Sequence, residues 1–305
     1  MNFEEFLKKS IEDLSGFFVN KDECKISITK EGARNHIAVR GQGEDKKIVI
    51  SNDMASFKID TPIKYLISLI VAGHEFAHCL CEHNKFKDTR KIESVAIEGF
   101  ADYFGARISF TLLNFGKNNF ENFSNFYGGM PFSDQKFLNL WLGEEEIFKC
   151  TGKALNEVNS MFYKGGDASG RYPSSEVRIL TFIAGVNSFF YRYRAKLSQE
   201  QSLKIFLGIW RNLDIQHSCT YGKDDHIEEI EPIHSSIQGD DLRISSGLTA
   251  FYENLIGTEF KLSNQVKLKK IINYLKNFES WEPSLVGELM EKLSSDLVKL
   301  SEDEN

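Results

Sequence analysis

Two histidines and a glutamate stand close together in the run VAGHEFAHCLCEHN, residues 71–84. His74 and His78 are four residues apart, and Glu75 directly follows the first of them. On a helix, residues four apart lie on one face, so both imidazoles can bind a single metal ion. The spacing H-E-x-x-H therefore predicts a zinc site in which Glu75 takes a proton from a metal-bound water.

The same five residues also occur on amphipathic helices whose histidines occupy core positions and bind no metal. A catalytic zinc ion needs a third protein ligand, so the acidic residues downstream decide between the two interpretations. Glu98 follows His78 by 20 residues, and Asp102 lies one helical turn beyond Glu98. Both stand in the apolar run ESVAIEGFADYFGARI, where an unpaired carboxylate is costly. Glu93 is a weaker third-ligand candidate because it is nearer the start of this predicted helix.

H-E-x-x-H followed at this distance by E-x-x-x-D resembles the gluzincin metallopeptidases, and EGFADYFG (98–105) is similar to a segment of thermolysin-like enzymes. The resemblance covers about residues 46–110 and implies that Glu98 is the third zinc ligand. It also implies that Asp102 accepts a hydrogen bond from His74 and fixes the tautomer of that ligand. Two neutral imidazoles, one carboxylate and one water agree with a zinc ion that keeps one position open.

Hydrolysis of a peptide bond also needs a donor that polarises the carbonyl group and stabilises the oxyanion. The segment RYPSSEVRI (171–179) is similar to the H-P-x-x-x-x-R-I segment of some membrane-linked gluzincins. Tyr172 stands where that pattern has histidine, and Arg178 matches its arginine. A phenol can donate to an oxyanion, so Tyr172 is one candidate, and His234, followed by Arg243, is the other. The ordinary alternatives are a tyrosine in a turn and a histidine on the surface.

Three more potential ligands, Cys79, Cys81 and His83, directly follow the motif. They raise the alternative of a structural zinc knot. Residues two apart on a helix point in different directions, so the two cysteines cannot readily share one metal ion. Buried cysteines commonly act as small hydrophobic residues. We therefore interpret all three residues as bystanders.

The composition is typical of a soluble globular protein, with 41% hydrophobic and 27% charged residues. The net charge of −7 and the lack of a long basic run disfavour nucleic-acid binding. Five cysteines, an odd number, favour free thiols in a reducing compartment, and the N-terminal residues lack the apolar core of a signal peptide. The apolar run 65–73 is too short to span a bilayer. We expect a cytoplasmic protein without a membrane or nucleic-acid partner.

Two helices must position the predicted ligands. Thr61 followed by Pro62 is typical of a helix start, and we expect the motif helix to extend from 62 to about 83. A helical period of apolar residues predicts a second helix from 88 to about 113, which carries the downstream carboxylates.

A small sheet is expected beside the motif helix. The segments 24–29, 36–41 and 46–51 are rich in β-branched residues or alternate, and turn residues between them predict an antiparallel meander. In zincin folds the strand at the edge of the cleft pairs with an extended substrate, and the resemblance implies this role for residues 46–53.

The remaining chain is predicted to be mostly helical, and the fold class is α+β, a zincin-like fold. We expect a catalytic half at 1–115, a loop or lid at 116–135 and a helical C-terminal half at 136–305 that completes the cleft. The helical patterns in the second half of the chain fall at 134–147, 151–163, 174–196, 199–212, 240–256, 265–277 and 283–301.

These features predict a zinc metalloendopeptidase that acts on an intracellular protein or peptide. One alternative is a dedicated protease with a single target in a bacterial stress or phage-defence system. Another is a regulatory module that keeps the fold without proteolysis, although the intact Glu75 argues against it. The oligomeric state is left open by the sequence.

Overall fold

A computed structural model describes residues 1–18, 24–31, 36–41, 43–81, 83–86, 91–129, 144–163, 172–193 and 199–214. Described residues are mostly helical and include one small sheet, which is an α+β composition. The predicted helices at 240–256, 265–277 and 283–301 lie outside the described residues, as do His234 and Arg243.

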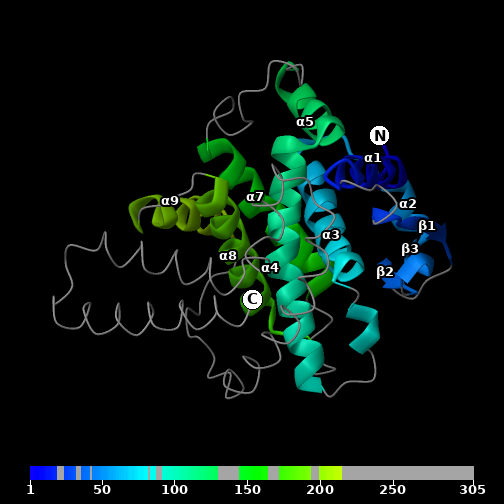
Figure 1. Ribbon diagram of the computed structural model, residues 1–305. Coiled ribbons are helices and arrows are strands. Elements are labelled where there is room, and N and C mark those ends of the chain that lie inside the picture. Colours follow the sequence, from blue (N-terminus) through cyan, green and yellow to red (C-terminus); the bar gives the residue numbers. More distant parts are fainter. Residues whose placement is uncertain are drawn as a thin grey trace, which may run out of the picture. The chain divides into compact units, whose positions relative to one another are not determined.

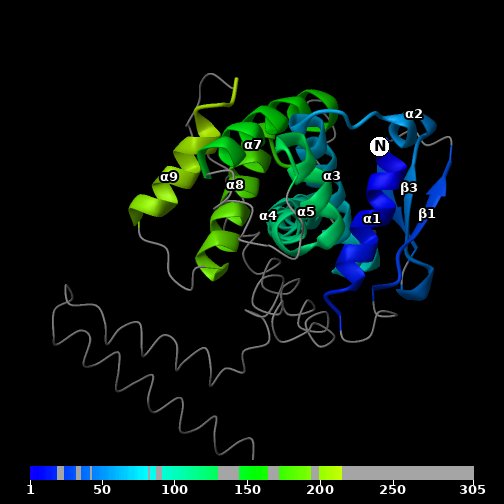
Figure 2. The same cartoon turned by 90° about the horizontal axis from the view of Figure 1, so that it is seen from above.

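The helices are α1 (Phe3–Ser15), α2 (Asn52–Ser56), α3 (Pro62–Leu80), α4 (Lys91–Phe115), α5 (Lys117–Ser124), α7 (Glu144–Val158), α8 (Ser175–Tyr193) and α9 (Gln199–Trp210). Short 3-10 turns occur at η2 (Gly43–Asp45), η3 (His83–Phe86) and η4 (Asn125–Tyr127), and η6 (Asn159–Tyr163) is a π-helical turn. In Figures 1 and 2, α3 and α4 lie side by side at the centre, between the sheet with α1 and the group of α7, α8 and α9.

The three strands are β1 (Ser27–Lys30), β2 (Ile37–Arg40) and β3 (Lys47–Ile50), and their order in the sheet is β1-β3-β2. β3 pairs in parallel with β1 and antiparallel with β2, so the predicted antiparallel meander is wrong. The apolar run Ile48–Val49–Ile50 is fully buried, which suits a central strand covered on both faces. The expectation that residues 46–53 form the edge of a cleft is also wrong, because β3 is the central strand and β2 an outer one.

Helix α3 begins where the sequence predicts. The Thr61 hydroxyl accepts a hydrogen bond from the backbone N–H of Lys64, and Pro62 occupies the first helical turn. The helix ends at Leu80, earlier than the predicted residue 83, with Cys81 as its C-cap. α3 is long and apolar enough to cross a membrane, but 78% of its most apolar window is buried inside the protein. Packing in the core therefore accounts for its apolar composition.

Two glycines let α3 and α4 approach each other closely. A Cβ atom at Gly105 of α4 would lie 2.8 Å from the backbone N and Cα of His74 in α3. A Cβ atom at Gly73 would meet the Gly105 carbonyl and the Ser109 hydroxyl. That hydroxyl donates to the carbonyl oxygen of Leu69 across the contact, at 2.9 Å. The absence of side chains at these two positions sets the distance between the helices beside His74.

The segment after α4 differs from the prediction. The sequence predicts a loop at 116–135, but α5 and η4 occupy 117–127. The predicted break between helical patterns near residue 150 is also absent, because α7 is continuous and ends in the π turn η6. Helix α5 forms in place of the predicted loop because Phe120 and Phe123, on one face of it, are fully buried.

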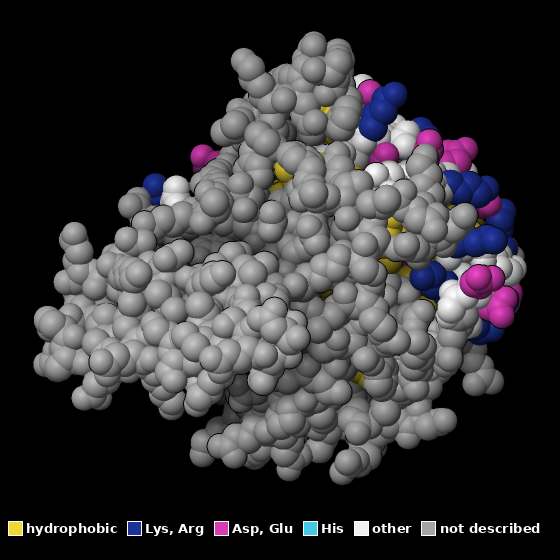
Figure 3. Space-filling model, viewed as in Figure 1, with side chains coloured by type: hydrophobic (Ala, Val, Ile, Leu, Met, Phe, Trp, Pro, Cys, Tyr) yellow, Lys and Arg dark blue, Asp and Glu magenta, His cyan; other side chains and the backbone are white. Residues whose placement is uncertain are grey.

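The molecular face over the sheet carries charges of both signs (Figure 3). Ion pairs on this side join Lys30 to Glu4 at 2.7 Å and Arg40 to Glu31 at 2.7 Å. Acidic and basic side chains therefore alternate on this side of the protein.

Candidate metal centre

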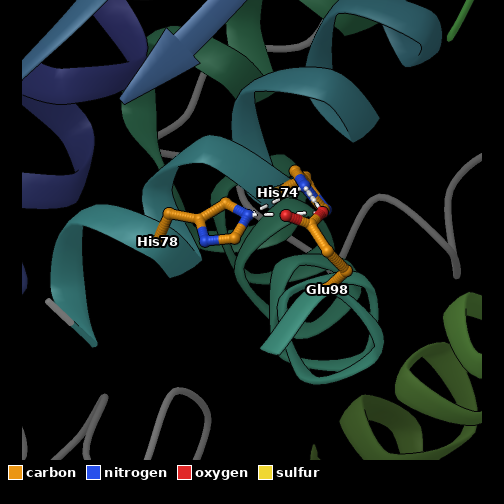
Figure 4. A group of neighbouring side chains, drawn as sticks. All are labelled: His74, His78 and Glu98. Carbon is orange, nitrogen blue, oxygen red and sulfur yellow. Dashed lines mark hydrogen bonds and ion pairs between the residues drawn. The ribbon is translucent and has the colours of Figure 1, made fainter. Parts of the chain in front are cut away.

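The nitrogen and oxygen atoms of His74, His78 and Glu98 converge between α3 and α4 (Figure 4). Nε2 of His74 lies 3.0 Å from Nε2 of His78, and Oε2 of Glu98 lies 3.3 Å and 3.7 Å from these nitrogens. Ligand atoms about 2.0–2.2 Å from a tetrahedral zinc ion lie roughly 3.3–3.6 Å apart. The three side chains therefore fit one zinc ion with little movement, and their donor set is that of a catalytic zinc site.

Asp102 of α4 lies between His74 of α3 and Arg178 of α8 and contacts both. Its Oδ1 lies 2.9 Å from Nδ1 of His74, on the side of the imidazole that faces away from the other ligands. Arg178 donates two hydrogen bonds to Asp102, from Nε at 2.7 Å and from Nη2 at 2.9 Å. Asp102 is almost fully buried, so a bidentate guanidinium partner is needed to keep it charged. The structure brings Asp102 into contact with His74, and the predicted hydrogen bond between them stays a prediction.

The charged side chains of the cluster shift the pKa values of His74 and Glu98. Burial opposes the charged form of His74, but Asp102 and Glu98 outweigh it and raise the pKa of His74 to about 10. Burial would raise the pKa of Glu98, yet His78 and His74 hold it well below its usual range. A metal ion bound here would have to displace a proton from His74, because imidazole binds a metal in its neutral form.

Glu75 belongs to the same site but not to the ligand group. It is 8% exposed and lines the cavity in front of the two histidines. Burial raises the pKa of its carboxyl group, although His74 and His78 oppose that shift. A carboxylate with a raised pKa is a better proton acceptor near neutral pH.

A cavity of about 590 Å³ opens in front of the cluster. The residues of β2 form one wall, and the end of α7 with the π turn forms another. The cavity is lined by His36, Ile37, Ala38, Val39, Arg40, Ile70, Val71, His74, Glu75, His78, Asn84, Glu98, Val158, Met161, Phe162, Tyr163, Tyr172 and Arg178. A cavity of this size accommodates a ligand of drug-like dimensions or a few residues of a peptide.

Of the two candidates for oxyanion stabilisation, Tyr172 lines this cavity and is 36% exposed. Its ring lies near the Arg178 guanidinium, with 5.6 Å between the guanidinium carbon and the ring centroid. His234 lies outside the described residues, and so does the side chain of Glu93. The structure therefore brings Tyr172 to the predicted site, while the role of His234 stays a prediction.

Two residues near the cluster were not assigned a role from the sequence. Tyr163, at the end of the π turn, places its ring 3.9 Å from the Arg178 guanidinium carbon and its hydroxyl 3.4 Å from Oδ1 of Asp102. His83, interpreted as a bystander, contacts His78. Tyr163 falls in a predicted helix without any local signal, because its contacts come from residues distant in sequence. A π turn within a helix is common at functional sites.

Cys79 and Cys81, the other two residues of the considered zinc knot, are buried thiols. Burial, aided by the nearby Glu75, raises the pKa of the Cys79 thiol above its ordinary value. Neither cysteine belongs to the group of converging ligands found among the described residues. This agrees with the interpretation of both as small core residues.

Comparison with known proteins gave no match among protein-family models, curated proteins or solved structures. The similarity to gluzincins therefore rests on the motif residues alone.

Proposed function

We propose that this protein is a zinc-dependent metallopeptidase that hydrolyses peptide bonds of a protein or peptide. The observation that carries the proposal is the convergence of His74, His78 and Glu98 at distances suited to zinc, with Glu75 beside them at a cavity. The carboxylate that follows the first histidine makes hydrolysis a better interpretation than a structural metal site, because a structural site needs no base.

Each residue of the site has a separate role in the proposed reaction. Zinc bound at the three ligands would lower the pKa of a water molecule and polarise a carbonyl oxygen. Glu75 takes the proton of the attacking water and then delivers it to the leaving amine. Tyr172, at the rim of the same cavity, is placed to donate to the oxygen that becomes negative. Asp102 and Arg178 hold His74 in position.

An extended peptide is the substrate that the cavity suits best. β2 pairs with β3 along one edge, and residues 36–40 line the cavity in front of the metal ligands. An outer strand can bind a peptide through backbone hydrogen bonds whatever its side chains are. β2 therefore takes the role that the sequence suggested for residues 46–53, and Val71, Met161 and Phe162 offer apolar contacts to side chains.

The test compares the wild-type chain with Glu75→Gln and His78→Ala. Zinc content of each purified protein is measured by atomic spectroscopy, and new protein termini are mapped after expression in a bacterial host. We expect wild type and Glu75→Gln to bind one zinc ion, His78→Ala to lose it, and only the wild type to produce new termini. A wild-type protein that binds no zinc when zinc is supplied would exclude the proposal.

The same experiment separates the alternatives. Cleavage of a single host protein would identify a dedicated protease, whereas zinc binding without any cleavage would favour a regulatory module. Two histidines and one carboxylate also form the facial triad of iron(II) oxygenases, so tight and selective iron binding would replace the peptidase proposal by an oxidative one.

A further inference from the structure

His83 lies against the proposed ligand His78. Its Nδ1 atom is 2.8 Å from Nδ1 of His78, and the two ring centroids are 4.9 Å apart. The side chain is 4% exposed and packs edge-on against Phe100, with 5.9 Å between the ring centroids. Because α3 ends at Leu80, the turn η3 brings His83 back against the last turn of the helix. The contact is thus built by two elements and closed by an aromatic neighbour.

The positions of the protons follow from the geometry. A hydrogen bond needs one donor and one acceptor, so only one of the two Nδ1 atoms can carry the shared proton. His78 directs its Nε2 toward His74 and Glu98, and a neutral imidazole that binds a metal through Nε2 carries its proton on Nδ1. The Nδ1 atom of His83 must then accept. The reverse arrangement would place the proton of His78 on Nε2 and leave no lone pair for a metal.

We propose that His83 is a positioning residue of the metal centre, which accepts a hydrogen bond from Nδ1 of His78 and thereby fixes its tautomer and ring orientation. The inference rests on the proposed function, because it requires a metal ion at the three ligands. His83 then acts on His78 as Asp102 acts on His74, with a neutral imidazole in place of a carboxylate. Partners of this kind orient the ligand and raise its basicity.

The structure also argues against His83 as a ligand. The converging group is formed by His74, His78 and Glu98, while His83 faces the nitrogen of His78 that points away from them. The other ring nitrogen of His83, Nε2, is buried and has no hydrogen-bond partner among the described residues. Within that part of the chain, the bond to His78 is therefore the contact that selects the tautomer of His83.

Two substitutions separate the hydrogen bond from packing. His83→Phe keeps an aromatic ring against Phe100 but has no acceptor, whereas His83→Asn places an amide oxygen near the position of Nδ1. The full-length wild type, both variants and His78→Ala are compared by zinc affinity in competition with a chromophoric chelator. Thermal midpoints of the metal-free proteins control for folding. We expect His83→Phe to bind zinc about 10- to 100-fold more weakly, and His83→Asn to recover most of that loss.

A second measurement needs no variant. Nitrogen-15 NMR of the histidines in the zinc-loaded wild type reports which ring nitrogen carries a proton. We expect His78 to be protonated at Nδ1 and His83 at Nε2, with Nδ1 of His83 showing the shift of an acceptor. A proton on Nδ1 of His83 would overturn the proposal even if the variants failed to fold.

The remaining outcomes of the affinity measurements also test the role of His83. Equal zinc affinity in the wild type and His83→Phe would show that His83 only fills space. A loss in His83→Asn as large as in His83→Phe, with unchanged thermal midpoints, would exclude the acceptor role. If both His83 variants lost zinc as completely as His78→Ala, His83 would be a ligand and the proposal would be wrong. In each of these results the wild type still binds zinc, so the proposed function stands, whereas a wild type that binds no zinc overturns both proposals.

Discussion

Two buried aspartates join neighbouring helices in this protein, and their partners differ in kind. Asp13 at the end of α1 accepts four hydrogen bonds from neutral N–H groups, the backbone and side-chain amides of Asn118 and Asn119, at 2.8–3.0 Å. Asp102 in α4 instead contacts a guanidinium and an imidazole. About 20 Å of helix separates the two sites along α4.

The two carboxyl groups also differ in the direction of their pKa shifts. Burial raises the pKa of Asp13, although the amides of Asn119 and Asn118 oppose the shift, so its charge is stabilised only in part. Burial would also raise the pKa of Asp102, but Arg178 and His74 lower it below its ordinary value. Neutral donors are sufficient to join helices, whereas a buried carboxylate that stays charged beside the proposed ligand His74 needs a cation.

Removing Asp102 should have the largest effect. Asp102→Ala leaves the buried Arg178 without its bidentate partner, and we expect the metal-free protein to lose about 3–5 kcal/mol of unfolding free energy. Zinc affinity should fall as well, because His74 loses the group that orients it. Urea denaturation and chelator competition measure the two effects. A loss below about 1 kcal/mol would mean that Arg178 finds another partner.

Removing Asp13 should affect stability alone. Asp13→Ala removes the acceptor of the buried backbone and side-chain N–H groups of Asn119, which should cost about 2–3 kcal/mol. Zinc affinity of the folded protein should equal that of the wild type, because the substitution is remote from the ligands. A weaker affinity at equal folded fraction would contradict the separation of the two sites.

Widening the contact between α3 and α4 should weaken the proposed zinc site beside His74 and leave the site of Asp13 unchanged. Gly105→Ala places a methyl group against the backbone of His74, and we expect a loss of about 1–3 kcal/mol together with weaker zinc binding. Gly99→Ala is the matched control, since among the described residues its Cβ atom would approach a Pro173 side-chain carbon alone, at 4.0 Å. Equal zinc affinity in the two variants would show that the spacing of the helices does not set the ligand geometry.

The smallest effect should be a pH dependence from Asp13. Its pKa is higher in the folded than in the unfolded chain, so the folded state takes up a proton first as the pH falls. The unfolding free energy of the wild type relative to Asp13→Asn should therefore rise as the pH decreases from the folded-state pKa toward about 4. Denaturation of both proteins across that range measures the difference, and a trend of opposite sign would refute the assigned shift.

Local sequence signals predicted the helices of the site well. Thr61 and Pro62 mark the start of α3, and the four-residue spacing of His74 and His78 places both on one face of it. The resemblance to gluzincins then singled out Glu98 and Asp102, and the structure brings both to His74. These signals depend on a few neighbouring residues, which is why they are readable without a structure.

Features that depend on distant partners were not predictable in the same way. The strand patterns were recognised, but the position of β3 between β1 and β2 depends on which strands pair, and side-chain alternation does not encode that choice. The contacts of Tyr163 with Arg178 and Asp102 require the π turn and α8 to meet. The sequence predicts a helix to about residue 83, whereas α3 ends at Leu80 and the turn η3 brings His83 back against His78.

The close approach at Gly73 and Gly105 has a thermodynamic consequence for metal exchange. Core packing of α3 against α4 holds His74, His78 and Glu98 at distances that suit zinc, so we expect the chain to fold without the proposed metal ion. In small zinc fingers, by contrast, binding and folding are one event, and a chelator unfolds the domain. Here a chelator should strip zinc and leave the native far-ultraviolet circular dichroism, and returning zinc should restore the loaded protein without refolding.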